Sequence, residues 1–184
     1  MIAVPERLLT LGEWDALPKG GSHRCELVGG VPLVVPRPAP IHQRVAYRLT
    51  GLLEAHLPEE FAAFGDVEVV VNPVHPATLR APDVVVVPSR PTDEYPARFS
   101  ADEVLLAVEI VSPGTGRTDR VTKPAEYADA GIPHYWLVDL DAPASLDAFT
   151  LVDGDYEHVA GGSGKVRVLS PFTITVDLAE LIRN

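Results

Sequence analysis

The chain has 184 residues, 46% of them hydrophobic and 22% charged, a balance typical of a soluble globular protein. Its formal net charge of −11 argues against nucleic-acid binding driven by the overall electrostatic field of the protein. Affinity for polyphosphates comes mainly from Lys and Arg. The single cysteine, Cys25, excludes an internal disulfide framework and a zinc site built from cysteines. We see no membrane-length apolar stretch and no signal-peptide layout, so we expect one cytoplasmic domain over residues 1–184.

The first third of the chain predicts a short helix, a hairpin and a longer helix. Residues 8–17 have a capping pattern and are expected to be helical. The strands expected over 25–28 and 31–35 flank a Gly-Gly pair, which is typical of a two-residue hairpin turn. Apolar residues recur at helical spacing over 41–57, which predicts an amphipathic helix with one buried face.

The rest of the chain alternates short apolar runs with turns. We expect strands over 67–71, 83–88, 104–111 and 134–139, a short helix over 125–130, and a last helix over 178–182. The strand–helix–strand order ending at residue 139 implies a crossover unit. The tail before the last helix is expected to form short strands separated by turns.

The run over residues 104–111 contains a single carboxylate, that of Glu109. The run is rich in β-branched residues and is ended by Ser112-Pro113-Gly114, so it predicts a buried strand. An ionised glutamate among Val and Leu is costly to bury unless a cation or hydrogen-bond donors meet it. We therefore expect a charged or polar partner beside Glu109.

A second apolar run, residues 81–88, carries Asp83 at its entrance. If the two runs pair end to end as antiparallel neighbours, Pro88 lies opposite Val104 and Asp83 lies opposite Glu109. Two facing carboxylates, about 5 Å apart at Cβ, form the oxygen-rich shell that a hard cation such as Mg²⁺ or Mn²⁺ uses. A structural salt bridge between one acid and an arginine explains the pattern equally well.

Three further residues are candidates for the same site. Lys123 lies on the first turn of the crossover and could activate water or stabilise a phosphate, although a lone lysine is usually a solvated surface residue. Glu26 lies in an apolar strand and either completes the acidic shell or points to solvent. His42 opens the long helix, where it could meet a phosphate or a metal, but we expect a surface histidine there.

The order Pro82-Asp83, Glu109-Ile110-Val111 and Lys123 resembles the PD-(D/E)XK nucleases. Val111 stands where a lysine would complete the usual Glu-x-Lys, so the lysine has moved to the helix. More specifically, the chain resembles the Uma-type restriction endonucleases over residues 10–139. The phrases that carry this likeness are Cys25-Glu26-Leu27-Val28-Gly29-Gly30, His42-Gln43-Arg44-Val45, Pro82-Asp83-Val84-Val85-Val86-Val87, Val108-Glu109-Ile110-Val111-Ser112-Pro113 and Tyr127-Ala128-Asp129-Ala130-Gly131-Ile132-Pro133-His134-Tyr135-Trp136-Leu137-Val138-Asp139.

The resemblance implies an α+β (α/β) restriction-endonuclease-like fold, with a mixed central sheet flanked by helices and additional N- and C-terminal strands. It also implies a homodimer that hydrolyses phosphodiester bonds of DNA with Mg²⁺ or Mn²⁺. The metal would be held at Asp83, Glu109 and Ile110, with Lys123 as the catalytic lysine and Glu26 as an additional acid. Proline is tolerated only in the first turn of a helix, so Pro124 requires the helix either to begin near Lys123 or to kink there.

Two other functions stay open at this point. A non-catalytic interaction or dimerisation module would keep the fold without cleaving a substrate. A metal-dependent hydrolase of a small phosphorylated molecule would suit the acidic composition better than a DNA enzyme does. The basic residues Arg117, Arg120 and Lys123 nevertheless form a local cationic edge beside the predicted site.

Overall fold

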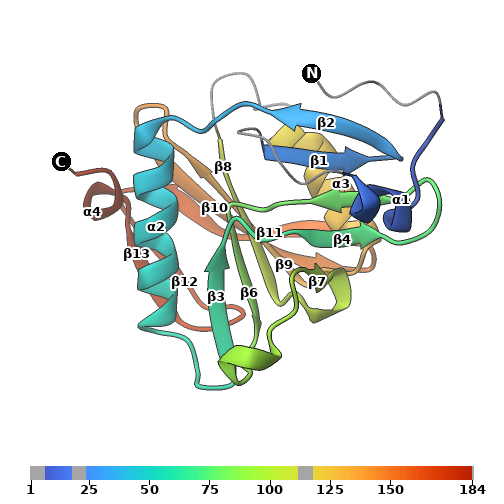
Figure 1. Cartoon of the computed structure of the whole chain (residues 1–184). Helices are drawn as coiled ribbons and strands as arrows, with labels where there is room; N and C mark the ends of the chain where they lie inside the picture. Colours follow the sequence, from blue (N-terminus) through green and yellow to red (C-terminus); the bar gives the residue numbers. More distant parts are fainter. Residues whose placement is uncertain (1–6, 18–23, 112–117, 184) are drawn as a thin grey trace.

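The computed structural model describes residues 7–17, 24–111 and 118–183, which form the mixed α+β structure in Figure 1. Within these residues, one sheet has six strands in the order β11-β10-β9-β8-β6-β3, and a second has five in the order β2-β1-β5-β4-β7. Strands β12 and β13 form a separate two-stranded ribbon. The predicted class of a mixed sheet with helices and additional terminal strands is confirmed.

The six-stranded sheet contains Glu109 in β8, and Asp83 lies immediately before its strand β6. Its strands are β3 (Phe61–Gly65), β6 (Val84–Pro88), β8 (Leu106–Val111), β9 (His134–Asp139), β10 (Ser145–Val152) and β11 (Asp155–Ser163). Strands β8 and β9 run parallel, whereas the other neighbours are antiparallel. A parallel pair needs a crossover, and α3 (Lys123–Asp129) supplies it as predicted.

The register between β6 and β8 agrees with the one predicted from matching the two apolar runs. Val84 pairs with Val108, Val85 with Ala107 and Val86 with Leu106. Continued by one step, this register brings Asp83 to the position facing Glu109. The prediction rested on pairing the two apolar runs along their whole length, and the observed pairs follow that alignment.

The five-stranded sheet begins with the predicted hairpin. Its strands are β1 (Arg24–Val28), β2 (Val31–Val35), β4 (Val69–Asn72), β5 (Thr78–Arg80) and β7 (Phe99–Ser100). Gly29 and Gly30 have φ angles of 53° and 76°, the left-handed conformation that a type I′ turn requires at both central positions.

Each face of the six-stranded sheet packs against a different part of the chain, because side chains alternate along a strand. Even-numbered residues of β6 and β8 pack against α2 (Pro40–Glu54), β12 (Lys165–Val168), β13 (Ile174–Asp177) and α4 (Leu178–Ile182). Odd-numbered residues pack against α3, β4 and β7. Glu109, an odd-numbered residue of β8, therefore lies on the α3 face, whereas the Asp83 carboxylate contacts His42 of α2.

Helix α2 forms as the sequence predicts, and its apolar stripe is fully enclosed. Val45, Leu49 and Leu53 have no exposed surface. Helix α1 (Leu11–Ala16) also forms, with a Thr10–Glu13 capping box. None of the helices in the described part of the chain is long and apolar enough to cross a membrane.

The sequence analysis missed strand β3. Its sequence, Phe-Ala-Ala-Phe-Gly, lacks the β-branched residues that favour strands, and it is ordered by pairing with β6. It also missed the three-residue β5, which is too short to show a period. Helix α3 begins at Lys123, two residues before the range expected from its pattern but where Pro124 in the first turn requires it to begin.

Candidate metal and catalytic site

Asp83 lies at the entrance to β6, where its side chain reaches the end of β8. Its Oδ2 atom accepts a hydrogen bond from the backbone N–H of Ile110 at 2.8 Å and lies 3.1 Å from Nε2 of His42. The same histidine nitrogen lies 3.0 Å from the carbonyl oxygen of Ile110. Carboxylate and carbonyl oxygens accept hydrogen bonds, so Nε2 is the ring nitrogen that carries a hydrogen here.

The expectation that His42 is a surface residue was wrong. The histidine is only 5% exposed and lies on the first turn of α2. The sequence contained the signal for this, because His42 precedes Val45 by three positions and Leu49 by seven, and this spacing places all three on one helix face. Its burial beside Asp83 makes it part of the candidate site.

Glu109 is enclosed on the α3 side of β8 and is 1% exposed. Its Oε2 atom lies 2.7 Å from Nζ of Lys123, and its Oε1 atom accepts a hydrogen bond from the Tyr127 hydroxyl at 2.6 Å. Burial raises the pKa of Glu109 to about 7, with the nearby carboxylates adding to the shift and Lys123 opposing it. This acid therefore changes its charge close to neutral pH.

Lys123 lies at the start of α3 and is buried between carboxylates. Its Nζ atom also lies 3.2 Å from Oδ1 of Asp119, which belongs to the π-helical turn Thr118–Thr122 that precedes the helix. Burial by itself lowers the pKa of Lys123, but the charges of Glu109, Glu26 and Asp119 outweigh it and raise the pKa above its ordinary value. The side chain is thus a buried ammonium, in contrast to an ordinary surface lysine.

Sequence reasoning missed two residues of this cluster, Tyr127 and Asp119. Both are four positions from Lys123 along the chain, so a helix through this segment places them on one face with it. That spacing was the available signal. The structure brings them to Glu109 and Lys123 through the hydrogen bond and the ion pair described above.

Glu26 is buried, and its carboxylate is bound by Arg80. The Arg80 Nη1 atom lies 2.8 Å from Glu26 Oε2, and the backbone N–H of Ala81 donates to Oε1 at 3.2 Å. Two further nitrogens of Arg80 bind Glu126 of α3 at 2.6 and 2.8 Å. Glu26 does not point to solvent, and its contacts support a structural role next to the site.

The predicted basic edge is only partly described. Arg117 lies outside the described residues, and Arg120 forms an ion pair with Asp139. Of the residues expected at the site, Asp83, Glu109, Ile110 and Lys123 do come together.

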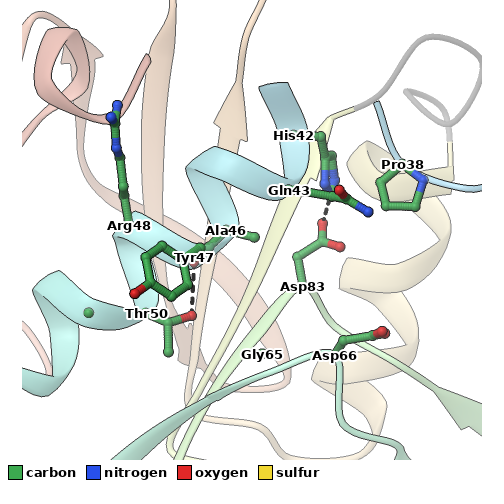
Figure 2. A pocket seen from close by; sticks show the side chains of 11 residues that line it. Pro38, His42, Gln43, Ala46, Tyr47, Arg48, Thr50, Gly65, Asp66 and Asp83 are labelled. Atoms are coloured by element: carbon green, nitrogen blue, oxygen red, sulfur yellow. Dashed lines mark hydrogen bonds and ion pairs between the residues drawn. The ribbon is translucent and has the colours of Figure 1, made fainter. Parts of the chain in front are cut away.

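A pocket of about 510 Å³ opens beside Asp83, between α2 and the turn after β3. Figure 2 shows its lining, which comes mainly from α2 and includes Gln43, Tyr47 and Thr50. The Tyr47 ring is 82% exposed at the pocket. On the opposite wall, Gly65 ends the edge strand β3 and Asp66 follows it. The pocket gives a ligand access to the Asp83 side of the site.

The donors around Asp83 fit a cation. Two oxygens, Asp83 Oδ2 and Ile110 O, lie close to the same nitrogen, His42 Nε2. Carboxylate and carbonyl oxygens are hard ligands of the kind that Mg²⁺ and Mn²⁺ bind. Each Glu109 oxygen accepts from one protein donor and so keeps a second lone pair. Across the described ranges, no three His, Cys, Asp or Glu side chains are arranged to hold one ion, so backbone and water ligands would be needed.

Comparison with known proteins identifies the family of the chain. Residues 11–179 match the model of the family Uma2, described as "Putative restriction endonuclease". The chain belongs to the Uma2 family. A crystal structure of a putative nuclease from Anabaena variabilis superposes with a TM-score of 0.74 at 18% sequence identity, covering 95% of this chain and 97% of that one. This likeness shows the nuclease-type fold that the sequence predicted. No curated protein matches the chain.

Proposed function

We propose that this Uma2 protein is a divalent-metal-dependent endonuclease that hydrolyses phosphodiester bonds of DNA. The observation that carries the proposal is the buried cluster in which Asp83 and Glu109 face each other and Lys123 lies 2.7 Å from Glu109. Carboxylates can hold a metal that polarises a phosphate, and an ammonium can stabilise the charge that develops on it. The family description supports the same chemistry.

Asp83, Glu109 and the carbonyl oxygen of Ile110 are the residues proposed to hold the metal. When bound, Mg²⁺ or Mn²⁺ supplies a Lewis acid that polarises the phosphate and lowers the pKa of the attacking water. Lys123 has three N–H groups, and its two carboxylate partners take two, so one can donate to water or to a phosphate oxygen. Tyr127 holds the Glu109 carboxylate in place.

The pocket beside Asp83 is proposed to receive the nucleotide that adjoins the scissile phosphate. The exposed ring of Tyr47 offers a stacking surface for a base, which aromatic side chains provide in many proteins that bind single strands. Glu26 is proposed to support the site through Arg80. The homodimer and the cytoplasmic location that the sequence suggested stay predictions.

A hydrolase of a small phosphorylated molecule is a second candidate. The pocket volume of about 510 Å³ lies within the range of small-molecule sites, and the net charge of −11 disfavours long polyanions. The non-catalytic interaction module also stays a candidate, because both acids have protein partners here.

Metal binding and DNA cleavage can be tested on the same samples. We would measure Mg²⁺ and Mn²⁺ binding by calorimetry, then follow nicking of plasmid DNA with and without EDTA. We expect metal-dependent nicking by the wild type and a rate lower by about 10²–10³-fold in Asp83→Asn, since an electrostatic contribution to the transition state is lost. Asp102→Asn, an exposed carboxylate in a 3₁₀ turn, is the matched control and should leave the rate unchanged.

The other outcomes separate the candidates. Metal binding without cleavage of any nucleic acid would favour the small phosphorylated substrate. A wild type that binds neither metal would contradict the proposal, and the interaction module would then be the better account.

A further inference from the structure

One imidazole nitrogen meets two of the oxygens proposed to bind the metal. His42 Nε2 lies 3.1 Å from Asp83 Oδ2 and 3.0 Å from the carbonyl oxygen of Ile110. These separations match those between adjacent ligands of one octahedral ion, because metal–ligand distances near 2.1 Å place neighbouring ligands about 3 Å apart. An ion that replaced the hydrogen on Nε2 would therefore have each of the two oxygens at the spacing of a neighbouring ligand.

The fold presents this nitrogen on rigid elements. His42 is buried on the first turn of a 15-residue helix whose apolar stripe, through Val45 and Leu49, is completely enclosed. The Asp83 carboxylate is oriented by the Ile110 N–H, which also fixes it relative to the end of β8. Preorganised ligands of this kind are what a binding site requires.

We propose, on the basis of the metal-dependent function above, that His42 Nε2 is a direct ligand of the metal. The ligand set then adds one nitrogen to Asp83, Glu109 and the Ile110 carbonyl, and the neutral imidazole carries its hydrogen on Nδ1. Imidazole binds transition metals well, whereas carboxylate and carbonyl oxygens suit Mg²⁺ and Mn²⁺. The nitrogen donor makes the site selective for Mn²⁺ or Co²⁺ over Mg²⁺.

The test is metal binding and pulsed EPR on the full chain, without use of an activity assay. We would titrate the wild type, His42→Ala and His42→Gln with Mn²⁺, Co²⁺ and Mg²⁺ by calorimetry, and record the nitrogen hyperfine coupling of bound Mn²⁺. The matched control is His56→Ala, which removes an exposed histidine just beyond the C-terminal end of α2.

We expect nitrogen coupling in the wild type and in His56→Ala, and its loss in both His42 variants. Affinity for Mn²⁺ and Co²⁺ should fall in the His42 variants by more than the roughly 10–100-fold that loss of an outer-shell partner costs, because a direct ligand is removed. Affinity for Mg²⁺ should change much less. His42→Gln keeps an N–H that can reach both oxygens, so it maintains the test if His42→Ala does not fold.

Two results would overturn the inference, and they differ in what else they affect. If Mn²⁺ binds the wild type without nitrogen coupling, His42 only orients Asp83, and the proposed metal-dependent function survives. If the wild type binds none of the three ions, both the inference and the proposed function fail.

Discussion

Asp83 and Glu109 occupy facing positions on neighbouring strands, yet their surroundings differ. Asp83 borders an open pocket and is held by a backbone N–H and by His42 of α2. Glu109 is enclosed by α3, where Lys123 and Tyr127 bind its two oxygens. One acid therefore borders a pocket, while the other lies in an environment that raises its pKa to about 7.

The comparison teaches that facing carboxylates need not be equivalent. The α3 side is stabilised by buried ion pairs, and such pairs are costly to break by removal of one partner. The pocket side depends on groups that a ligand can contact, so changes there should affect binding more than folding. The following predictions test this division.

The largest effect is expected from Arg80→Met, next to the α3 side. Arg80 is 3% exposed and binds Glu26 and Glu126, so its removal leaves two carboxylates without their cation. We expect the free energy of unfolding to fall by about 3–5 kcal/mol in urea denaturation. Arg183→Met, which breaks an exposed pair with Glu180, is the control and should cost no more than about 1 kcal/mol. Similar losses of unfolding free energy in both variants would show that the buried ion pairs of Arg80 stabilise the fold no more than an exposed pair does.

The second prediction concerns the pH dependence of stability. The pKa of Glu109 is raised from 4.5 to about 7 in the folded chain, chiefly by burial. Its contribution to stability is therefore fully present below the unfolded-state pKa and is lost as the pH rises through about 7. Measured between about pH 5 and pH 8, the free energy of unfolding of the wild type should decline relative to that of Glu109→Gln.

The titration of His134 does not affect this comparison between wild type and Glu109→Gln. Burial lowers its pKa, so it affects stability on the acidic side, but it is present in both proteins and cancels in their difference. A difference between wild type and Glu109→Gln that stays constant with pH would show that Glu109 is not titrating near neutrality.

The smallest effect on folding is expected at the pocket. Tyr47→Ala should change the free energy of unfolding by less than about 0.5 kcal/mol, because the ring is 82% exposed. It should nevertheless weaken oligonucleotide binding by about 1–3 kcal/mol if a base stacks on the ring. Fluorescence anisotropy in an Asp83→Asn background, which prevents cleavage, measures this, with Tyr47→Phe retaining affinity. Equal binding by all three proteins would place the substrate elsewhere.

The sequence alone predicted much of the scaffold around the site. The β6–β8 register followed from two apolar runs of equal length, and the Gly29-Gly30 hairpin followed from turn chemistry. The α3 crossover and the start of that helix near Lys123 followed from element order and from the restriction that Pro124 imposes. These features depend on local periodicity or on backbone geometry, both of which can be read from neighbouring residues.

Only the tertiary structure decided how the charged groups pair. Arg80 binds Glu26 and Glu126, which are 54 and 46 residues away from it along the chain. His42 contacts Asp83, which is 41 residues away along the chain. Such contacts depend on how strands and helices from distant segments pack, which periodicity within one segment does not determine. The sequence therefore determined that Asp83 and Glu109 face each other, because the register is local to two strands. Packing of α2 against Asp83 and of α3 against Glu109 determined which partners each acid has.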